Sequence, residues 1–318
     1  MTIRFDTFAA DGRGWQAAFP SPEEVREAFS PAAVRELVDW VAAGTLAGRW
    51  CVLCLAYEAA GAFDPALHTH AAAAHQPLAW GAMLADPLPP APAPERKPYT
   101  VSPWAPLVTR AGYEAGINRV QALIGAGDTY QVNYTFPLQA RFHGDPLSWY
   151  LDLGTAQQAG YCAYLDLGRH QILSLSPELF FERTGSTITT RPMKGTIRRG
   201  RWTAEDDKLA AELAACPKNR AENIMIVDLL RNDLGRIARP DTVQVPRLFT
   251  VEALDQVFQM TSTVTAKCLP QTSLMDLLGA LFPCGSVTGA PKIRTMEIIK
   301  ALEPNPRGVY TGTIGLIK

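Results

Sequence analysis

The sequence lacks an apolar run as long as a membrane-spanning helix, which needs about 20 residues. Residues 1–6 also lack the apolar core of a secretory signal peptide. There is no excess of basic residues, because the formal net charge at pH 7 is −1. A nucleic-acid-binding protein neutralises phosphates with a basic face, so this charge balance argues against that class.

Cysteine is sparse, with six residues scattered along the chain. Cys51 and Cys54 form a CxxC pattern, but the surrounding run is apolar and has no glycine or proline turn of the kind a redox site uses. We therefore expect both to be buried structural thiols. This cysteine usage predicts a reduced, cytoplasmic protein.

Proline is concentrated in residues 86–98, which form the one clear connector in the sequence. Such a segment is stiff and extended and often separates folded units. The sequence thus predicts an N-terminal segment, residues 1–98, followed by a second domain, residues 99–318. With 47% hydrophobic residues, the chain has ample material for a large core.

Short strands and separate helices alternate in blocks along the chain. The residue patterns predict helices over 34–43, 113–124, 221–234, 273–281 and 291–302. They predict strands over 51–57, 130–136, 161–167, 171–175, 179–183, 187–190 and 251–265. Runs of adjacent strands followed by helices indicate an α+β fold with largely antiparallel sheets and helices outside.

The first candidate site is a lysine, Lys194, in the turn-bounded segment 191–196, with a carboxyl group, Glu178, after a proline upstream. A hairpin with its tip near residues 184–186 would place the two side chains on one face, or on opposite faces if the register slips by one. The functional interpretation is a lysine nucleophile, which requires a neutral amine. Spacing alone favours a salt-bridged lysine at a sheet edge.

Two further segments are candidate ligand-binding sites. On the helix predicted over 221–234, Glu222 shares a face with aliphatic residues. A carboxylate in this position could be a ligand for a hard ion such as Mg²⁺. The same pattern is equally typical of an ordinary amphipathic helix. Residues 285–292 form a glycine-rich turn before a helix, with Ser286 and Thr288 as hydroxyl donors. Such a turn can hold an anion, and the spacing is not that of a P-loop, so a small carboxylate fits better than a nucleotide. Glycine turns before helices are also common without any ligand.

These segments, in this order, resemble the chorismate-utilising enzymes from about residue 113 to the last residue, with a fainter similarity at 55–58. The matching segments are residues 127–133, 176–178, 192–196, 222–233, 285–292 and 307–312. The resemblance implies that family's α+β fold, with antiparallel sheets packed face to face. Family members that add water to chorismate have lysine where this chain has Gln131, whereas those that use ammonia have glutamine.

Lys194 implies one branch of the family. Anthranilate-forming members have a small residue at that position, so the pairing of Gln131 with Lys194 resembles the members that form 4-amino-4-deoxychorismate for p-aminobenzoate and folate synthesis. In the implied mechanism Lys194 attacks the chorismate ring and Glu178 protonates the departing 4-hydroxyl. Ammonia then displaces the lysine. An anthranilate-forming enzyme, or an impaired remnant that serves only as a binding module, is the alternative.

The resemblance also implies the other site residues. Glu222 matches a Mg²⁺-ligand position. Substrate-pocket positions correspond to Gln131, Gly285, Ser286, Thr288, Gly289 and Tyr310. Ammonia is expected from a separate glutamine amidotransferase subunit. In the family, further strands and a helix with the remaining carboxylate-binding and Mg²⁺-binding residues follow the strand that here ends at Lys318, so we expect a C-terminally incomplete chorismate-binding domain.

Overall fold

The structure is a computed structural model that describes residues 1–9, 11–73, 75–89 and 94–318. Part of the predicted connector, residues 90–93, lies outside the described residues. All strand pairs among the described residues are antiparallel. The α+β prediction is therefore confirmed.

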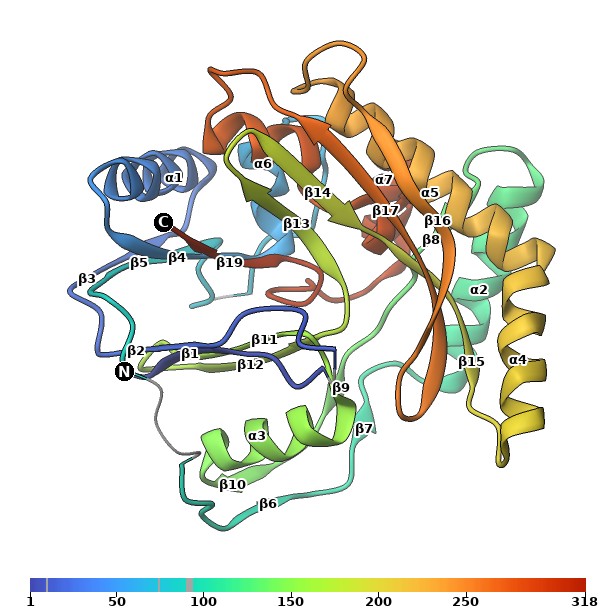
Figure 1. Cartoon of the computed structure of the whole chain (residues 1–318), viewed down its shortest axis with the longest axis horizontal. Helices are drawn as coiled ribbons and strands as arrows, with labels where there is room; N and C mark the ends of the chain where they lie inside the picture. Colours follow the sequence, from blue (N-terminus) through green and yellow to red (C-terminus); the bar gives the residue numbers. More distant parts are fainter. Residues whose placement is uncertain (10, 74, 90–93) are drawn as a thin grey trace.

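Two four-stranded sheets lie one above the other (Figure 1). The first has the order β12 (Gln171–Ser176), β11 (Tyr161–Asp166), β1 (Ile3–Asp6), β2 (Ala17–Phe19). The second has the order β19 (Thr313–Ile317), β4 (Trp50–Leu55), β5 (Ala79–Leu84), β3 (Glu24–Ala28). Their facing side chains, such as Phe5, Trp80 and Leu165, form one buried core cluster. Burying this apolar surface is the main force holding the two sheets together.

Both sheets combine strands from the two sides of residue 98. In the first sheet β1 pairs with β11, and in the second β4 pairs with β19. The division of the chain at residue 98 stays a prediction. These pairings mean that folding of either sheet requires residues from both segments.

A third, five-stranded sheet positions the candidate lysine. It contains β13 (Leu179–Thr184), β14 (Thr187–Arg191), β15 (Met193–Arg198), β16 (Gln244–Ala253) and β17 (Val257–Lys267). The predicted strand over 251–265 is in fact parts of β16 and β17, which pair with each other. Strands β14 and β15 both pair with β17 and lie end to end along it, separated by Pro192.

Helices cover the sheets (Figure 1). Their bounds are α1 Pro31–Leu46, α2 Arg110–Gly125, α3 Pro146–Gln157, α4 Thr203–Ala215, α5 Pro217–Gly235, α6 Leu274–Leu281 and α7 Lys292–Leu302. Helix α1 packs on the β4/β5 sheet, and α5 packs on the third sheet through residues such as Ile226 and Leu230. Ser273 begins α6 with a capping box in which its hydroxyl accepts from the N–H of Asp276.

The remaining elements are short. Two-stranded pairs join β6 (Tyr99–Val101) to β10 (Phe142–Gly144), β7 (Ala105–Pro106) to β9 (Leu138–Gln139), and β8 (Gln131–Val132) to β18 (Gly289–Ala290). Short 3₁₀ helices are η1 (Tyr57–Ala62) and η2 (Gly285–Val287). The prediction of a strand over 130–136 is wrong beyond β8. Asn133 and Thr135 are instead held by hydrogen bonds to Val287 and Glu303.

Both thiols of the CxxC pattern are buried on β4 and free. Cys51 belongs to the core beneath α1, while Cys54 belongs to the core between the two sheets. Burial raises the pKa of Cys54 to about 12, which makes it a poor nucleophile. The structural interpretation of these cysteines agrees with their placement.

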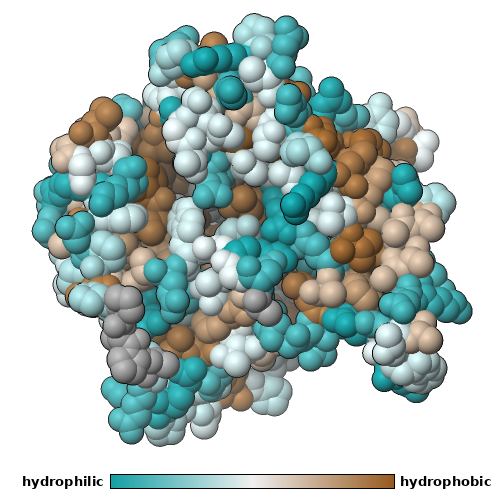
Figure 2. All heavy atoms as spheres, viewed as in Figure 1, coloured by the Kyte–Doolittle hydropathy of each residue, from teal (hydrophilic) through white to brown (hydrophobic). Residues whose placement is uncertain are grey.

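The visible surface is chemically mixed. Figure 2 shows polar residues spread among apolar ones, in keeping with exposed side chains such as Leu248 and Ile224. No helix in the described part of the chain has the length and apolar character needed to cross a membrane.

Candidate active site

Lys194 lies on β15, just past the interruption at Pro192. The hairpin itself pairs β13 with β14, with Thr184 opposite Thr187, so Lys194 is beyond the hairpin, on a strand that pairs with β17 instead. A bulge between Met193 and Thr196 contains Gly195 at φ +96°, a conformation that favours glycine. A bulge changes the direction of the adjacent side chain. The direction of the Lys194 side chain is therefore set by this bulge and not by a position opposite Glu178 across a hairpin.

The Lys194 amine points to the glycine-rich turn. Its Nζ donates to the backbone carbonyl oxygen of Ser286 at 2.6 Å. Burial lowers the pKa of Lys194, while the nearby Glu178, Cys284 and Glu222 oppose that shift. A lowered pKa increases the fraction of neutral amine, the form that can act as a nucleophile.

Glu178 stands immediately before β13 and is directed into the same region. Its Oε1 is buried without a hydrogen-bond partner among the described residues. Burial raises the pKa of Glu178, and the Ser286 hydroxyl, the Lys194 ammonium and the Met193 N–H oppose that shift by favouring the carboxylate. A raised pKa favours the protonated acid. The environment thus moves the amine and the acid in the directions that nucleophile and proton donor require.

The turn that follows α6 contacts Lys194 and Glu178 through Ser286. Ser286 is buried, and its hydroxyl lies 3.2 Å from the Cys284 thiol. Burial raises the pKa of Cys284 to about 11, so this thiol stays protonated near neutral pH. Thr288 is fully buried, and its hydroxyl donates to the Cys284 and Gly285 carbonyl oxygens, so it stabilises the turn itself.

Gln131 lies beside this turn because β8 pairs with β18. Ala290 is opposite Gln131, and Gly289 is opposite Val132. Gly289 has φ +144°, and a Cβ there would collide with the Gln131 carbonyl and the side chain of Thr295. The Oε1 of Gln131 is buried without a partner among the described residues, and a polar ligand atom could satisfy it.

Two predicted site residues are less enclosed. Tyr310 is 64% exposed and lies at the surface. Glu222 is half-buried on α5 and forms an ion pair with Lys218 at 3.9 Å. Its charge acts on Lys194, which places it near the site.

The described residues contain no group of three or more His, Cys, Asp or Glu side chains placed to hold one metal ion. Glu222 offers a single carboxylate, whereas Mg²⁺ in proteins takes oxygen ligands in a near-octahedral arrangement. These residues alone do not make a fitting Mg²⁺ site.

Sequence reasoning gave no role to Arg307, although it begins one of the matching segments. Its side chain is 3% exposed and paired with Glu303 at 2.6 Å. It also donates to the carbonyl oxygens of Asn133 and Val287, at 2.6 and 2.9 Å. The i,i+4 spacing of Glu303 and Arg307 is a local signal, whereas the contacts with Asn133 and Val287 join residues distant in sequence and leave none.

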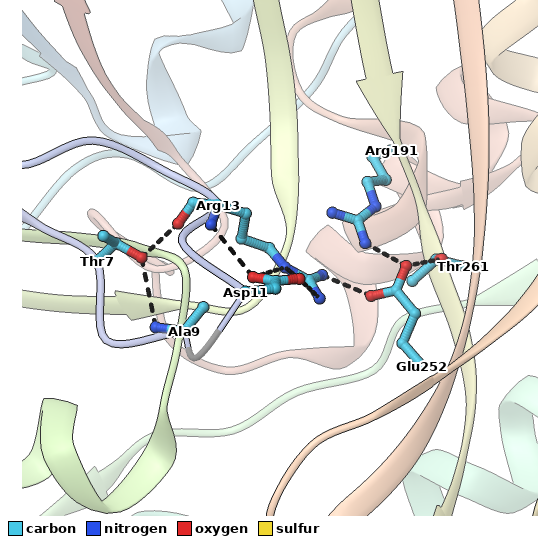
Figure 3. Close-up of polar contacts among 7 residues, drawn as sticks. All are labelled: Thr7, Ala9, Asp11, Arg13, Arg191, Glu252 and Thr261. Atoms are coloured by element: carbon cyan, nitrogen blue, oxygen red, sulfur yellow. Dashed lines mark hydrogen bonds and ion pairs between the residues drawn. The ribbon is translucent and has the colours of Figure 1, made fainter.

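A polar network braces the strand before Lys194 (Figure 3). Glu252 on β16 accepts from Arg13 at 2.5 Å, from Thr261 at 2.6 Å and from Arg191 at the end of β14. Arg13 also pairs with Asp11. The N-terminal loop is thereby tied to the third sheet, next to Pro192.

Replacing Glu252 with glutamine is expected to lower the free energy of unfolding by about 2 kcal/mol at pH 7, because two partly buried charge-assisted contacts, with Arg13 and Arg191, are lost. Burial raises the pKa of Glu252, but hydrogen bonds from Thr261, Arg191 and Arg13 leave it below its ordinary value. Because the carboxyl pKa of Glu252 is lower in the folded state, its ionised form stabilises the fold above the unfolded-state pKa of 4.5. This stabilisation is lost as pH falls through the folded-state pKa. Urea unfolding at pH 7 to 3 measures this difference.

The matched control is Glu212→Gln, because Glu212 belongs to an exposed ion pair with Lys208. This control should change the unfolding free energy by less than about 0.5 kcal/mol. A Glu252→Gln difference that is absent at pH 7, or that grows as pH falls, would contradict the assigned role.

The fold and the site together define a class of protein: an α+β enzyme with antiparallel sheets and a half-buried lysine and glutamate suited to nucleophilic and acid chemistry. The chain belongs to the chorismate binding enzyme family, whose model matches residues 51–318. The expected family is therefore confirmed.

The chain is similar to two groups of curated relatives. Aminodeoxychorismate synthase component 1 of Salmonella typhimurium is 45% identical over 226 residues, which are 71% of this chain and 50% of that protein. Anthranilate synthase component 1 of Streptomyces coelicolor is 41% identical over 216 residues, which are 67% of this chain and 42% of that protein. The chain thus spans about half the length of the curated relatives it matches.

A solved structure agrees with the fold. Anthranilate synthase component I from Streptococcus pneumoniae superposes with a TM-score of 0.79 and 24% identity, covering 98% of this chain and 80% of that one. At this identity the likeness establishes the α+β architecture and leaves the reaction open.

Proposed function

We propose that this chain carries the catalytic lysine and acid of an aminodeoxychorismate-forming enzyme, which converts chorismate and ammonia to 4-amino-4-deoxychorismate. The observation that carries the proposal is the half-buried pair at one turn, with the pKa of Lys194 lowered and that of Glu178 raised. The similarity to aminodeoxychorismate synthase component 1 supports it. Anthranilate synthase is the competing enzyme, and Lys194 is the residue that argues against it.

In the first step, neutral Lys194 forms a C–N bond to the chorismate ring. The bond from the ring to the 4-hydroxyl oxygen breaks, and protonated Glu178 supplies the proton that makes the leaving group water. This leaves a lysine adduct with an extra proton on nitrogen and Glu178 as carboxylate. Covalent catalysis of this kind divides one difficult displacement into two easier steps.

In the second step, ammonia bonds to the 4-position and the C–N bond to Lys194 breaks. The electron pair returns to the lysine, which leaves as the neutral amine. The new ammonium group gives one proton to the Glu178 carboxylate and restores the acid. The balance is chorismate plus ammonia to 4-amino-4-deoxychorismate plus water.

Three further parts of the proposal concern the metal ion, the source of ammonia and the substrate contacts. Glu222 stays a proposed Mg²⁺ ligand, one that would need other oxygen ligands besides itself. Ammonia is proposed to come from a separate glutamine amidotransferase subunit, and the name "component 1" of the relatives supports a second component. Gln131 and the 285–289 turn are the proposed substrate contacts.

The test is incubation of the full chain with chorismate, ammonium and Mg²⁺, followed by chromatographic identification of the product. We expect 4-amino-4-deoxychorismate, and we expect Glu178→Gln to lower the rate by about 10²- to 10⁴-fold, the usual contribution of a general acid. Asp228→Asn, which alters an exposed carboxylate on α5, is the control and should keep the wild-type rate.

The possible products separate the competing functions. Anthranilate would establish the other enzyme of the family. Binding of chorismate with no product at all would favour a binding module over an enzyme. Full activity in Glu178→Gln would remove Glu178 from the mechanism.

A further inference from the structure

Arg307 occupies a buried position where three separate segments meet. Its Nε and one terminal nitrogen pair with Glu303, at 2.8 and 2.6 Å. The same side chain donates to the carbonyl oxygens of Asn133 and Val287 and to the Thr311 hydroxyl. Each of its five N–H groups therefore has an acceptor, and its guanidinium also lies 4.7 Å from the centroid of the Tyr57 ring.

The backbone around Arg307 is fixed as firmly as its side chain. The buried carboxylate of Glu58 accepts from the N–H groups of Arg307 and Gly308, at 2.7 and 2.9 Å. The N–H of Tyr57 donates to the Gly308 carbonyl at 2.7 Å. Arg307 is thus anchored to the second sheet, through the segment that follows β4.

The two carbonyl groups that Arg307 holds belong to the segments around the candidate site. Val287 lies between Ser286 and Thr288, and its carbonyl oxygen also accepts from Asn133 Nδ2 at 3.1 Å. With two donors on one oxygen, the orientation of this peptide is determined. The preceding carbonyl, that of Ser286, is the acceptor for the Lys194 amine at 2.6 Å.

We propose that Arg307 is a positioning residue that fixes the Ser286–Thr288 turn and thereby holds the Lys194 amine in its partly buried position against the Ser286 carbonyl. It acts through Val287 and Ser286 and does not touch the reacting atoms. Its catalytic consequence rests on the proposed function, whereas its effect on Lys194 does not. Planar geometry is essential, because one guanidinium binds both carboxylate oxygens, two carbonyls and a hydroxyl at once, whereas an ammonium has only three donors.

The test measures the titration of Lys194 in the full-length chain, without chorismate. Acetic anhydride modifies neutral amines, and peptide mass spectrometry gives the extent of modification at Lys194 against pH, with the exposed Lys208 as internal reference. In the wild type the Lys194 midpoint should lie below the ordinary value of a lysine, because burial lowers its pKa. In Arg307→Gln the loosened turn admits water, so the Lys194 midpoint should rise by about one pH unit, a tenfold loss of neutral amine.

Two further variants separate geometry from charge. Arg307→Lys keeps a positive charge beside Glu303, and we expect it to recover stability while leaving the Lys194 midpoint displaced. Arg4→Gln removes a buried ion pair with Asp6 in the first sheet and should leave the Lys194 midpoint unchanged. If Arg307→Gln does not fold, Asn133→Ala removes one of the two donors to Val287 and should give a smaller shift in the same direction.

An unchanged Lys194 midpoint in Arg307→Gln would overturn the proposal, as would a wild-type midpoint in Arg307→Lys. Where Arg307→Gln cannot be measured, an unchanged midpoint in Asn133→Ala would overturn it too. A chain that makes no product from chorismate would count against the proposed function alone, because the titration needs no substrate.

Discussion

Replacing Lys194 with alanine is expected to lower the formation of 4-amino-4-deoxychorismate by at least about a thousandfold, the order of loss when a covalent nucleophile is removed. Alanine offers no amine to bond to the ring, so the displacement would have to occur in one step. Initial rates with chorismate and ammonium measure the loss. Lys208→Ala, which removes an exposed lysine on α4, is the control and should keep the wild-type rate.

Lys194→Arg distinguishes a nucleophile from a structural cation. Arginine can still donate to the Ser286 carbonyl and retain a positive charge near Glu178, but it stays protonated at any pH at which the protein is folded. We expect this variant to fold with near wild-type stability and to be as inactive as Lys194→Ala. Activity within a few-fold of wild type in Lys194→Arg would exclude covalent catalysis by this residue.

The sequence was informative wherever a structure is determined locally. Apolar residues at helical spacing gave α2 and α5, and Ser273 marked the start of α6 because a cap is a contact between near neighbours. The tight turn at residues 184–187 likewise follows from glycine and short side chains at the hairpin tip. These elements could be predicted because the residues that stabilise them lie within a few positions of one another.

The geometry around Lys194 could not be predicted in the same way. Nothing in residues 191–196 says that β15 leaves the hairpin to pair with β17, or that the amine meets the Ser286 carbonyl. Both features depend on strands far away in sequence. The family resemblance identified Lys194 and Glu178 together, whereas spacing alone favoured a salt-bridged lysine.

The same reasoning explains the strand that was wrongly predicted over 130–136. Alternating apolar and polar residues there match a strand, but only β8 finds a partner. Beyond it, Glu303 and Val287 hold Thr135 and Asn133 by side-chain contacts. Tertiary hydrogen bonds replaced the ladder that local pattern implied, and Glu303 and Arg307 gave no local sign of this role.

The ion pair between Lys292 and Asp233 is expected to give a large stability effect. Its atoms are 2.7 Å apart, and the two side chains are 12% and 5% exposed. The pair joins the start of α7 to α5. Lys292→Met would leave the carboxylate buried without its partner, and we expect a loss of about 3–5 kcal/mol in the free energy of unfolding at pH 7.

The pKa shift of Asp233 is opposite in direction to that of Glu252, although the deficit of each variant shrinks as pH falls. Burial raises the pKa of Asp233, and the Lys292 ammonium opposes that shift. Without Lys292 the raised pKa makes the ionised carboxylate costly above the folded pKa, and protonation removes that cost as pH falls. Urea unfolding should therefore show the Lys292→Met deficit shrinking from pH 7 toward pH 4. The double variant Lys292→Met/Asp233→Leu should regain most of the loss, since no buried charge remains. A double variant as unstable as the single one would mean that packing, rather than an uncompensated charge, causes the deficit.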